Sequence, residues 1–387
     1  LRQEHPPRIP LSDSGIKNWE KIDPLVYRRT IDIALGQRIQ NSVSSQLSMF
    51  FRNSDAVFCT ERSIKLEQLL FFDLETSGLS SGAGTVAFLA AFGRYKHTDD
   101  LNTALSVTQF LLLDYPGEAV FLEQIQMQLS DIELDPVVVS YNGKSFDIPL
   151  LRSRLVMNGL QPFAVKHLDL LHPARLLWKT ILPSCSLTEI EKSVLNFDRG
   201  LDLPGSQAPE AWFTFLKKGT WDALDRICEH NAHDLHGLAL LFDRINRTSN
   251  KPLYAYKHDK LDTDALFLRY FYYLKRQGRT DHALISAAYN TGALNTLYHA
   301  SRQYVREGCY EEAKTLLFRI VNDTGAAVKR VCTAYRLLSI IEEWKVKNYA
   351  AALDYAQKAR DLYDHDSVPS LDHDKRINRL KEKTGQA

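Results

Sequence analysis

The chain has 387 residues, enough for two or three domains and at least one sizeable hydrophobic core. Its apolar content of 44% and charged content of 25% are those of an ordinary globular protein. The net charge of +1 excludes a global attraction to nucleic acid or membranes, so a site for polyanions must be a local patch or use bound metal.

Residues 1–60 are predicted to form a poorly defined N-terminal extension. Three prolines close to the start disfavour a helix there, at Pro6, Pro7 and Pro10. Two short runs with strand character follow at 26–27 and 31–33.

From residue 61 the pattern changes to one of buried strands. The apolar run at 69–72 predicts a strand that ends in Asp73. A turn rich in glycine and serine follows at 78–84, and residues 85–93 predict a second strand. We therefore expect residues 69–93 to form a hairpin.

Strands and helices then alternate along the chain. The expected elements are a strand at 105–113, a helix at 116–129, a strand at 136–139, a helix at 146–157 and a long amphipathic helix at 221–245. Strands first, and then strands alternating with helices, predict an α/β domain over 61–250 with a mixed sheet flanked by helices.

After Pro252 the strand signal disappears, and residues 260–387 are predicted to be all helical. Three similar segments, 278–283, 308–313 and 347–352, each follow one helix and open another. Their spacing averages near the ~34 residues of a tetratricopeptide repeat, in which a small residue allows two helices to cross closely. A tetratricopeptide-like repeat domain and an unrelated helical bundle both fit this pattern.

Cysteine spacing and hydropathy indicate an ordinary intracellular protein. No apolar run approaches the roughly 20 residues that span a bilayer, and the N-terminus shows no signal-peptide pattern. The cysteines lie far apart without the spacing of a metal site, which is typical of reduced thiols, at Cys59, Cys185, Cys228, Cys309 and Cys332. We therefore expect a cytoplasmic location.

Two Asp-x-Glu pairs occur, and their context separates them. Asp131 and Glu133 precede an apolar run in a polar connection, where their charges are expected to face solvent. Asp73 and Glu75 follow an apolar strand directly, and the period of two places them on the same side of the chain. Two like charges at the end of a buried strand need a compensating cation, and Mg²⁺ favours carboxylate oxygens.

A second polar motif covers residues 141–150. Its Gly-Lys-Ser at 143–145 is not a Walker loop, because the position that requires glycine is Val138. The segment instead predicts a strand, a loop with Asn142, and a helix whose first turn contains Asp147. Asp147 fits a functional carboxylate, and it also fits a simple charge that stabilises the helix dipole.

A third motif lies within the long helix. His230 and Asp234 are four residues apart and share one helical face. Asp234 fits a metal ligand, with His230 one turn away and able to take a proton from water. A His–Asp pair on the surface of an amphipathic helix fits the same spacing.

Taken together and in this order, the three motifs resemble those of the DEDD superfamily of 3′–5′ exonucleases. The likeness is greatest to YprB-type proteins with an RNase H-like domain, which also resemble this chain over residues 167–175. The resemblance covers residues 61–250 well and the helical tail loosely.

The resemblance implies a metal-dependent phosphodiesterase that acts on single-stranded DNA or RNA. It implies a two-metal site for Mg²⁺ or Mn²⁺, with the ligands Asp73, Glu75, Asp147 and Asp234. His230 would be the general base, although it stands four residues before Asp234, the spacing of the tyrosine branch of the superfamily and not of the histidine branch.

Substrate contacts and partners are expected around this site. The candidates for substrate binding are Thr76, Asn142 and Lys144. The helical tail is expected to offer a surface to a protein partner. The alternative function is a non-catalytic adaptor that binds nucleic acid or protein on a nuclease-like fold.

Overall fold

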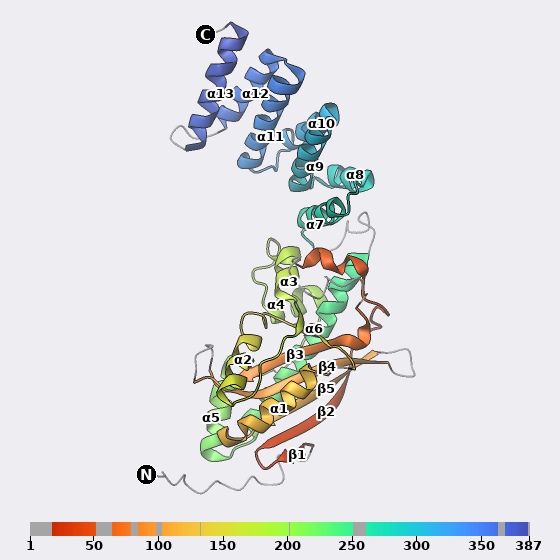
Figure 1. Cartoon of the computed structure of the whole chain (residues 1–387), viewed down its shortest axis with the longest axis vertical. Coiled ribbons are helices and arrows are strands. Elements are labelled where there is room, and N and C mark those ends of the chain that lie inside the picture. Colours follow the sequence, from red (N-terminus) through yellow and green to blue (C-terminus); the bar gives the residue numbers. More distant parts are fainter. Residues whose placement is uncertain are drawn as a thin grey trace. The chain divides into compact units, whose positions relative to one another are not determined.

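The computed structural model describes residues 18–51, 64–78, 84–97, 103–131, 133–200, 202–250, 261–362 and 368–385. The prolines at positions 6, 7 and 10, Cys59 and most of the turn at 78–84 lie outside these residues. The chain forms two compact units, Leu1–Lys251 and Pro252–Ala387, and each is described by itself (Figure 1).

A seven-stranded sheet is the centre of the first unit, in the order β1-β2-β5-β4-β3-β6-β7. Strands β6 and β7 run parallel to β3, whereas the other pairings are antiparallel, so the predicted mixed sheet is confirmed. The strands are β1 (Glu20–Asp23), β2 (Val26–Ala34), β3 (Leu69–Thr76), β4 (Ala87–His97), β5 (Thr103–Leu112), β6 (Val137–Ser140) and β7 (Lys166–Asp169).

The predicted hairpin is confirmed as the antiparallel pair β3 and β4, but its first strand is longer than expected. Strand β3 does not end at Asp73, because its pairing with β4 continues to Thr76 and places Glu75 opposite Leu89. Hydrogen bonding to a neighbour therefore extends the strand beyond its apolar run. Asp73 and Glu75 lie inside a central strand.

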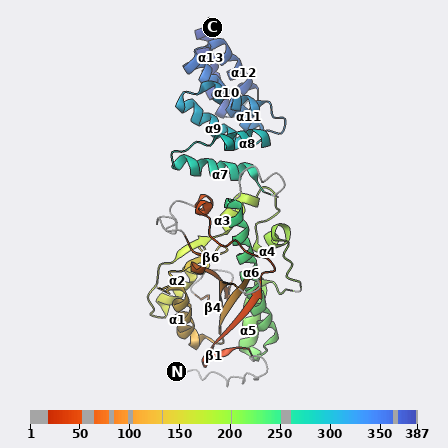
Figure 2. The same cartoon turned by 90° about the vertical axis from the view of Figure 1, so that its right-hand side faces the viewer.

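The two faces of β3 pack against different helices. Phe71 packs edge-on against Phe242, with ring centroids 5.9 Å apart, and Phe242 belongs to the helix α6 (Asp222–Asn250). The alternate residues Leu70, Phe72 and Leu74 are buried in a cluster with residues of α1 (Glu118–Leu129) and α2 (Asp147–Met157). Figure 2 shows the sheet between α1 and α2 on one side and α6 on the other.

The sheet includes part of the stretch that the sequence left as an undefined extension. Strand β2 pairs along its whole length with β5, from Val26 opposite Leu112 to Ala34 opposite Ala104. Its partner lies far away in the sequence, so the local pattern does not show the pairing. The domain boundaries themselves remain predictions.

The expected helices of the first unit are confirmed as α1, α2 and α6, each within a few residues of its predicted limits. The remaining helical elements, within the described ranges, are η1 (Ser45–Phe50), η3 (Leu66–Gln68), η4 (Tyr115–Gly117), α3 (Leu171–Trp178), α4 (Leu187–Ile190), the π-helical turn η5 (Glu191–Leu195), η6 (Gly205–Gln207) and α5 (Ala208–Lys218).

The second unit is helical throughout its described part, as expected. It contains α7 (Thr263–Arg276), α8 (His282–Thr291), α9 (Leu294–Glu307), α10 (Tyr310–Val321), α11 (Val328–Ile341), η8 (Glu342–Val346), α12 (Tyr349–Asp361) and α13 (Val368–Thr384). Ala313 and Ala352 are fully buried, whereas Ala283 is exposed, so a close helix crossing does not explain the small residue of the first segment. The tetratricopeptide assignment stays a prediction.

Within the residues that the structure describes, no helix has the length and apolar character needed to cross a membrane.

Candidate functional site

One cavity of about 320 Å³ brings the three sequence motifs together. Strand β3 supplies Asp73 and Glu75, the start of α2 supplies Asp147, and α6 supplies His230 and Asp234. All five residues that the sequence singled out for chemistry therefore line the same cavity. Their assigned roles remain proposals.

Local structure explains why these side chains converge. The alternation of β3 turns Asp73 and Glu75 toward the face that α6 covers. His230 and Asp234 are one helical turn apart on α6, and His230 Nε2 lies 3.3 Å from Asp234 Oδ2. Asp147 is the first residue of α2, where the helix dipole favours a carboxylate.

Three of these residues have the geometry of a cation site. Glu75, His230 and Asp234 each offer one ligand atom, and these atoms lie within 4.8 Å of one another. Asp73 and Asp147 line the same cavity outside this group. His230 was expected beside a metal and not as a ligand, and this position is compatible with both roles.

The carboxylates are short of positive charge. Burial, followed by the charges of Asp234 and Asp147, raises the pKa of Asp73 well above its ordinary value. Burial and the charge of Asp73 raise the pKa of Glu75 in the same way. Burial and the charge of Asp169 raise the pKa of Asp147 to about 7. A bound cation would offset this repulsion.

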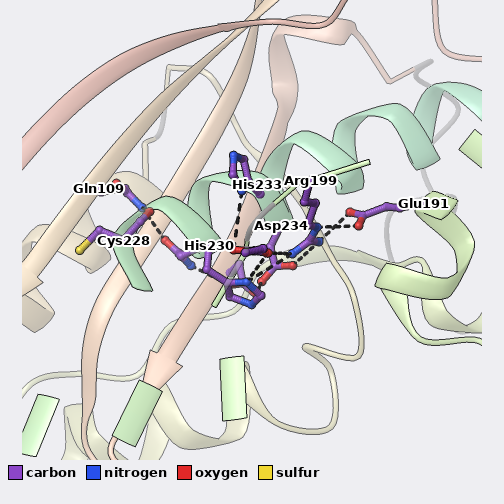
Figure 3. A network of polar contacts seen from close by, with 10 residues as sticks. Gln109, Glu191, Arg199, Cys228, His230, His233 and Asp234 are labelled. Carbon is purple, nitrogen blue, oxygen red and sulfur yellow. Dashed lines mark hydrogen bonds and ion pairs between the residues drawn. The ribbon is translucent and has the colours of Figure 1, made fainter. Parts of the chain in front are cut away.

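A chain of neutral amides holds Asp73 in place. Asn231 Nδ2 donates to Asp73 Oδ2 at 2.7 Å, and Gln109 Nε2 donates to Asn231 Oδ1 at 2.8 Å. Gln109 also donates to the Cys228 carbonyl oxygen at 2.8 Å, so β5 and α6 together orient the carboxylate (Figure 3).

Asp169 holds the loop that precedes Asp147. It is buried and accepts hydrogen bonds from the backbone N–H groups of Asn142 at 2.8 Å and Lys144 at 3.1 Å. Asn142 has a φ of 67°, a left-handed conformation that asparagine tolerates. The sequence marked residues 167–175 through a family resemblance, but it did not indicate this supporting role for Asp169.

The predicted substrate-binding residues lie in different places. Thr76 lines the cavity, and its hydroxyl donates to the Gly78 carbonyl oxygen at 2.7 Å. Asn142 lines a neighbouring cavity of about 490 Å³, together with Tyr141 and Arg175. Lys144 lines neither of these two cavities.

The candidate site lies within a region that matches a known protein family. The sequence model of the RNase H superfamily matches residues 70–246. This match covers less than half of the chain, and the matched region is called the RNase H-like domain below. The RNase H-like domain thus contains all of the cavity's candidate catalytic residues.

The RNase H-like domain has a relative in Bacillus subtilis (strain 168), the protein YprB, which is 37% identical over 182 residues. The match covers 46% of this chain and 42% of YprB, so the chain spans less than half the length of that relative.

Two solved structures of exonuclease I also share similarity with part of the chain. E. coli exonuclease I in complex with a dT13 oligonucleotide is 18% identical, with a TM-score of 0.28 and coverage of 43% of this chain and 40% of that one. A second exonuclease I structure is 19% identical, with a TM-score of 0.26 and coverage of 49% and 43%. At these TM-scores neither likeness bears on function.

The RNase H-like domain contains two site residues that the sequence did not reveal, Arg199 and Asp202. Both lie in the loop between η5 and η6, which carries no motif. Asp202 Oδ2 lies 2.7 Å from His230 Nδ1, and Arg199 Nη2 donates to Asp234 Oδ1 at 2.6 Å (Figure 3). Burial by itself would raise the pKa of Asp202, but hydrogen bonds from His230 and Arg199 lower it below its ordinary value.

Gly143→Ala is expected to disturb Asp147 from within the loop. A Cβ at this position would lie 2.3 Å from Ser140 Oγ and 2.8 Å from Asp147 Oδ2. Both distances are too short for a non-bonded contact with a carbon atom, so the loop must shift at a cost of about 1–3 kcal/mol. Thermal melting should show this loss, whereas Gly84→Ala, which meets nothing within 4 Å, should melt like the wild type. Equal melting of the two variants would contradict the role of Gly143.

Proposed function

We propose that this chain is a metal-dependent nuclease that hydrolyses phosphodiester bonds of single-stranded DNA or RNA from the 3′ end. One observation carries the proposal: four carboxylates and a histidine from three distant segments line one cavity of an RNase H-like domain. Burial of carboxylates with raised pKa values lowers the stability of the fold, and such groups cluster at functional sites.

The donor set fits a hard divalent cation such as Mg²⁺ or Mn²⁺, because it consists mainly of carboxylate oxygens. Asp73, Glu75, Asp147 and Asp234 would hold two such ions. When bound, the metal supplies Lewis-acid activation of water and stabilisation of the leaving 3′ oxygen.

His230 is the proposed general base. Asp202 accepts a hydrogen bond from Nδ1, which fixes the tautomer and leaves the lone pair of Nε2 directed into the cavity. Nε2 would take a proton from the attacking water as the bond between phosphorus and the 3′ oxygen breaks. Thr76, Asn142 and Lys144 remain proposed contacts to the substrate backbone.

The direct test is a Mn²⁺-dependent assay on single-stranded DNA and RNA, with the label at either end. A 3′–5′ exonuclease releases a 3′ label at once as a mononucleotide and shortens a 5′-labelled strand stepwise. A blocked 3′ end should stop the reaction. Binding of either strand without turnover would instead support the adaptor function.

Asp131→Asn combined with Glu133→Gln should leave hydrolysis nearly unchanged. Glu133 is exposed, and Asp131 uses Oδ1 to accept hydrogen bonds from the backbone N–H groups of Glu133 at 3.1 Å and Leu134 at 3.2 Å. This pair shapes a turn away from the cavity lining. Rates measured in the same assay check this, and a loss as large as that of Asp73→Asn would show that the wrong pair was chosen.

A further inference from the structure

A buried guanidinium group lies against the carboxylate cluster. Arg199 is 5% exposed, and its Nη2 donates to Asp234 Oδ1 at 2.6 Å. Its Nε and Nη2 also donate to the two oxygens of Glu191, at 2.7 Å each, and Nη1 donates to Asp202 Oδ2 at 3.2 Å (Figure 3). Three carboxylates from three segments therefore hold the guanidinium group of Arg199 in place.

The position of Arg199 is built into the fold. Glu191 is 1% exposed and packs directly over Gly237 of α6, where a Cβ would lie 1.6 Å from Glu191 Oε1. The Phe197 backbone N–H donates to the Glu191 carbonyl oxygen at 2.9 Å, and the Phe197 ring packs on His236 with centroids 4.4 Å apart. This ion pair therefore depends on a glycine in the helix that carries Asp234.

Arg199 compensates the negative charge of Asp234, one of the residues that line the cavity. Asp234 has Oδ1 bound to the guanidinium group, which leaves Oδ2 facing His230 Nε2. Asp73, by contrast, accepts a hydrogen bond from the neutral amide of Asn231. Positive charge is therefore supplied from within the protein at Asp234, and a cation that binds there must share this carboxylate with Arg199.

We propose that Arg199 is a positioning residue that makes the affinities of the two metal-ion sites unequal. The cation that binds Asp234 is the weaker of the two, because it loses one carboxylate oxygen and is repelled by a fixed positive charge nearby. This inference rests on the proposed function only in requiring that the cavity binds divalent cations.

Mn²⁺ titration of the full chain, by calorimetry or by electron paramagnetic resonance of free Mn²⁺, tests the inference without an activity readout. The wild type should show one tighter and one weaker step. Glu191→Gln combined with Arg199→Gln removes both buried charges together and keeps a hydrogen-bonding pair. In this double variant the weaker step should tighten on the order of tenfold or more.

Two matched variants separate electrostatics from loss of structure. Glu191→Gln alone leaves the charge of Arg199 less neutralised, so the weaker step should become weaker still. Arg199→Lys keeps the charge and should titrate close to the wild type. A mere structural defect would not move the double and the single variant in opposite directions.

An unchanged or weakened second step in the double variant would overturn the inference while leaving the proposed function intact. Failure of the wild type to bind Mn²⁺ any better than Asp73→Asn would overturn both.

Discussion

Asp73→Asn should reduce hydrolysis to background while the protein remains folded. Asparagine preserves the shape of the side chain and removes a charge from the lining of the cavity. The amide from Asn231 that now binds Asp73 Oδ2 can still donate to the new side-chain oxygen. Rates from the Mn²⁺ assay, with circular dichroism as a check on folding, measure this. Activity close to wild type in Asp73→Asn would contradict the metal-site assignment.

The same substitution should stabilise the protein when metal is removed, and more so at higher pH. The pKa values of Asp73 and Glu75 are raised, and that of Asp147 is about 7, so the folded state retains protons that the unfolded chain releases near pH 4. The stability that these groups contribute is complete at low pH and is lost as pH rises through the folded values. For Asp147 the loss extends from about pH 4 to about pH 7.

Thermal melting in chelator at pH 5.5 and pH 8 measures this effect. The gain in melting temperature of Asp73→Asn over the wild type should be larger at pH 8 than at pH 5.5. In a domain of this size, each kcal/mol of relieved repulsion raises the melting temperature by about 2–4 °C. Added Mn²⁺ should stabilise the wild type at pH 8 and the variant much less. A gain that is equal at both pH values would remove charge repulsion as its cause.

His230→Ala should lower the hydrolytic rate by ~10²–10⁴, the usual contribution of a general base. The histidine lines the cavity, and Asp202 holds its Nδ1 so that Nε2 faces Asp234 and Glu75. Because a base is not a ligand, Mn²⁺ affinity should remain near that of the wild type. A parallel loss of Mn²⁺ affinity and rate would instead make His230 a metal ligand.

His233→Ala is the matched control on the same helix. His233 lies outside the cavity lining, with Nδ1 3.8 Å from Asp202 Oδ1, and one residue along the helix turns it about 100° away from Asp234. Its removal should change the rate little. If His233→Ala is inactive and His230→Ala is near normal, the mechanism must be rebuilt around a different residue.

Local patterns along the sequence were enough to place the chemistry-bearing residues on the right kinds of element. These local features are the alternation around Asp73 and Glu75, the helix start at Asp147 and the four-residue spacing of His230 and Asp234. They can be read from the sequence because a strand repeats every two residues and a helix every 3.6. The mixed sheet and the helical second unit follow from the same periodicities. The order of the motifs further linked the chain to RNase H-like proteins.

Only the tertiary structure showed what surrounds these residues. The pairing of β2 with β5 depends on contacts between distant segments, which no local pattern encodes. Asp202 and Arg199 lie in a loop without a motif, and Asp169 lies in a segment whose family resemblance did not indicate its role. Each of the three gains its role from hydrogen bonds across the fold. Burying an ion pair such as that of Arg199 with Glu191 costs desolvation free energy, which is offset only where the fold brings both charges together in good geometry, so its position is decided by packing.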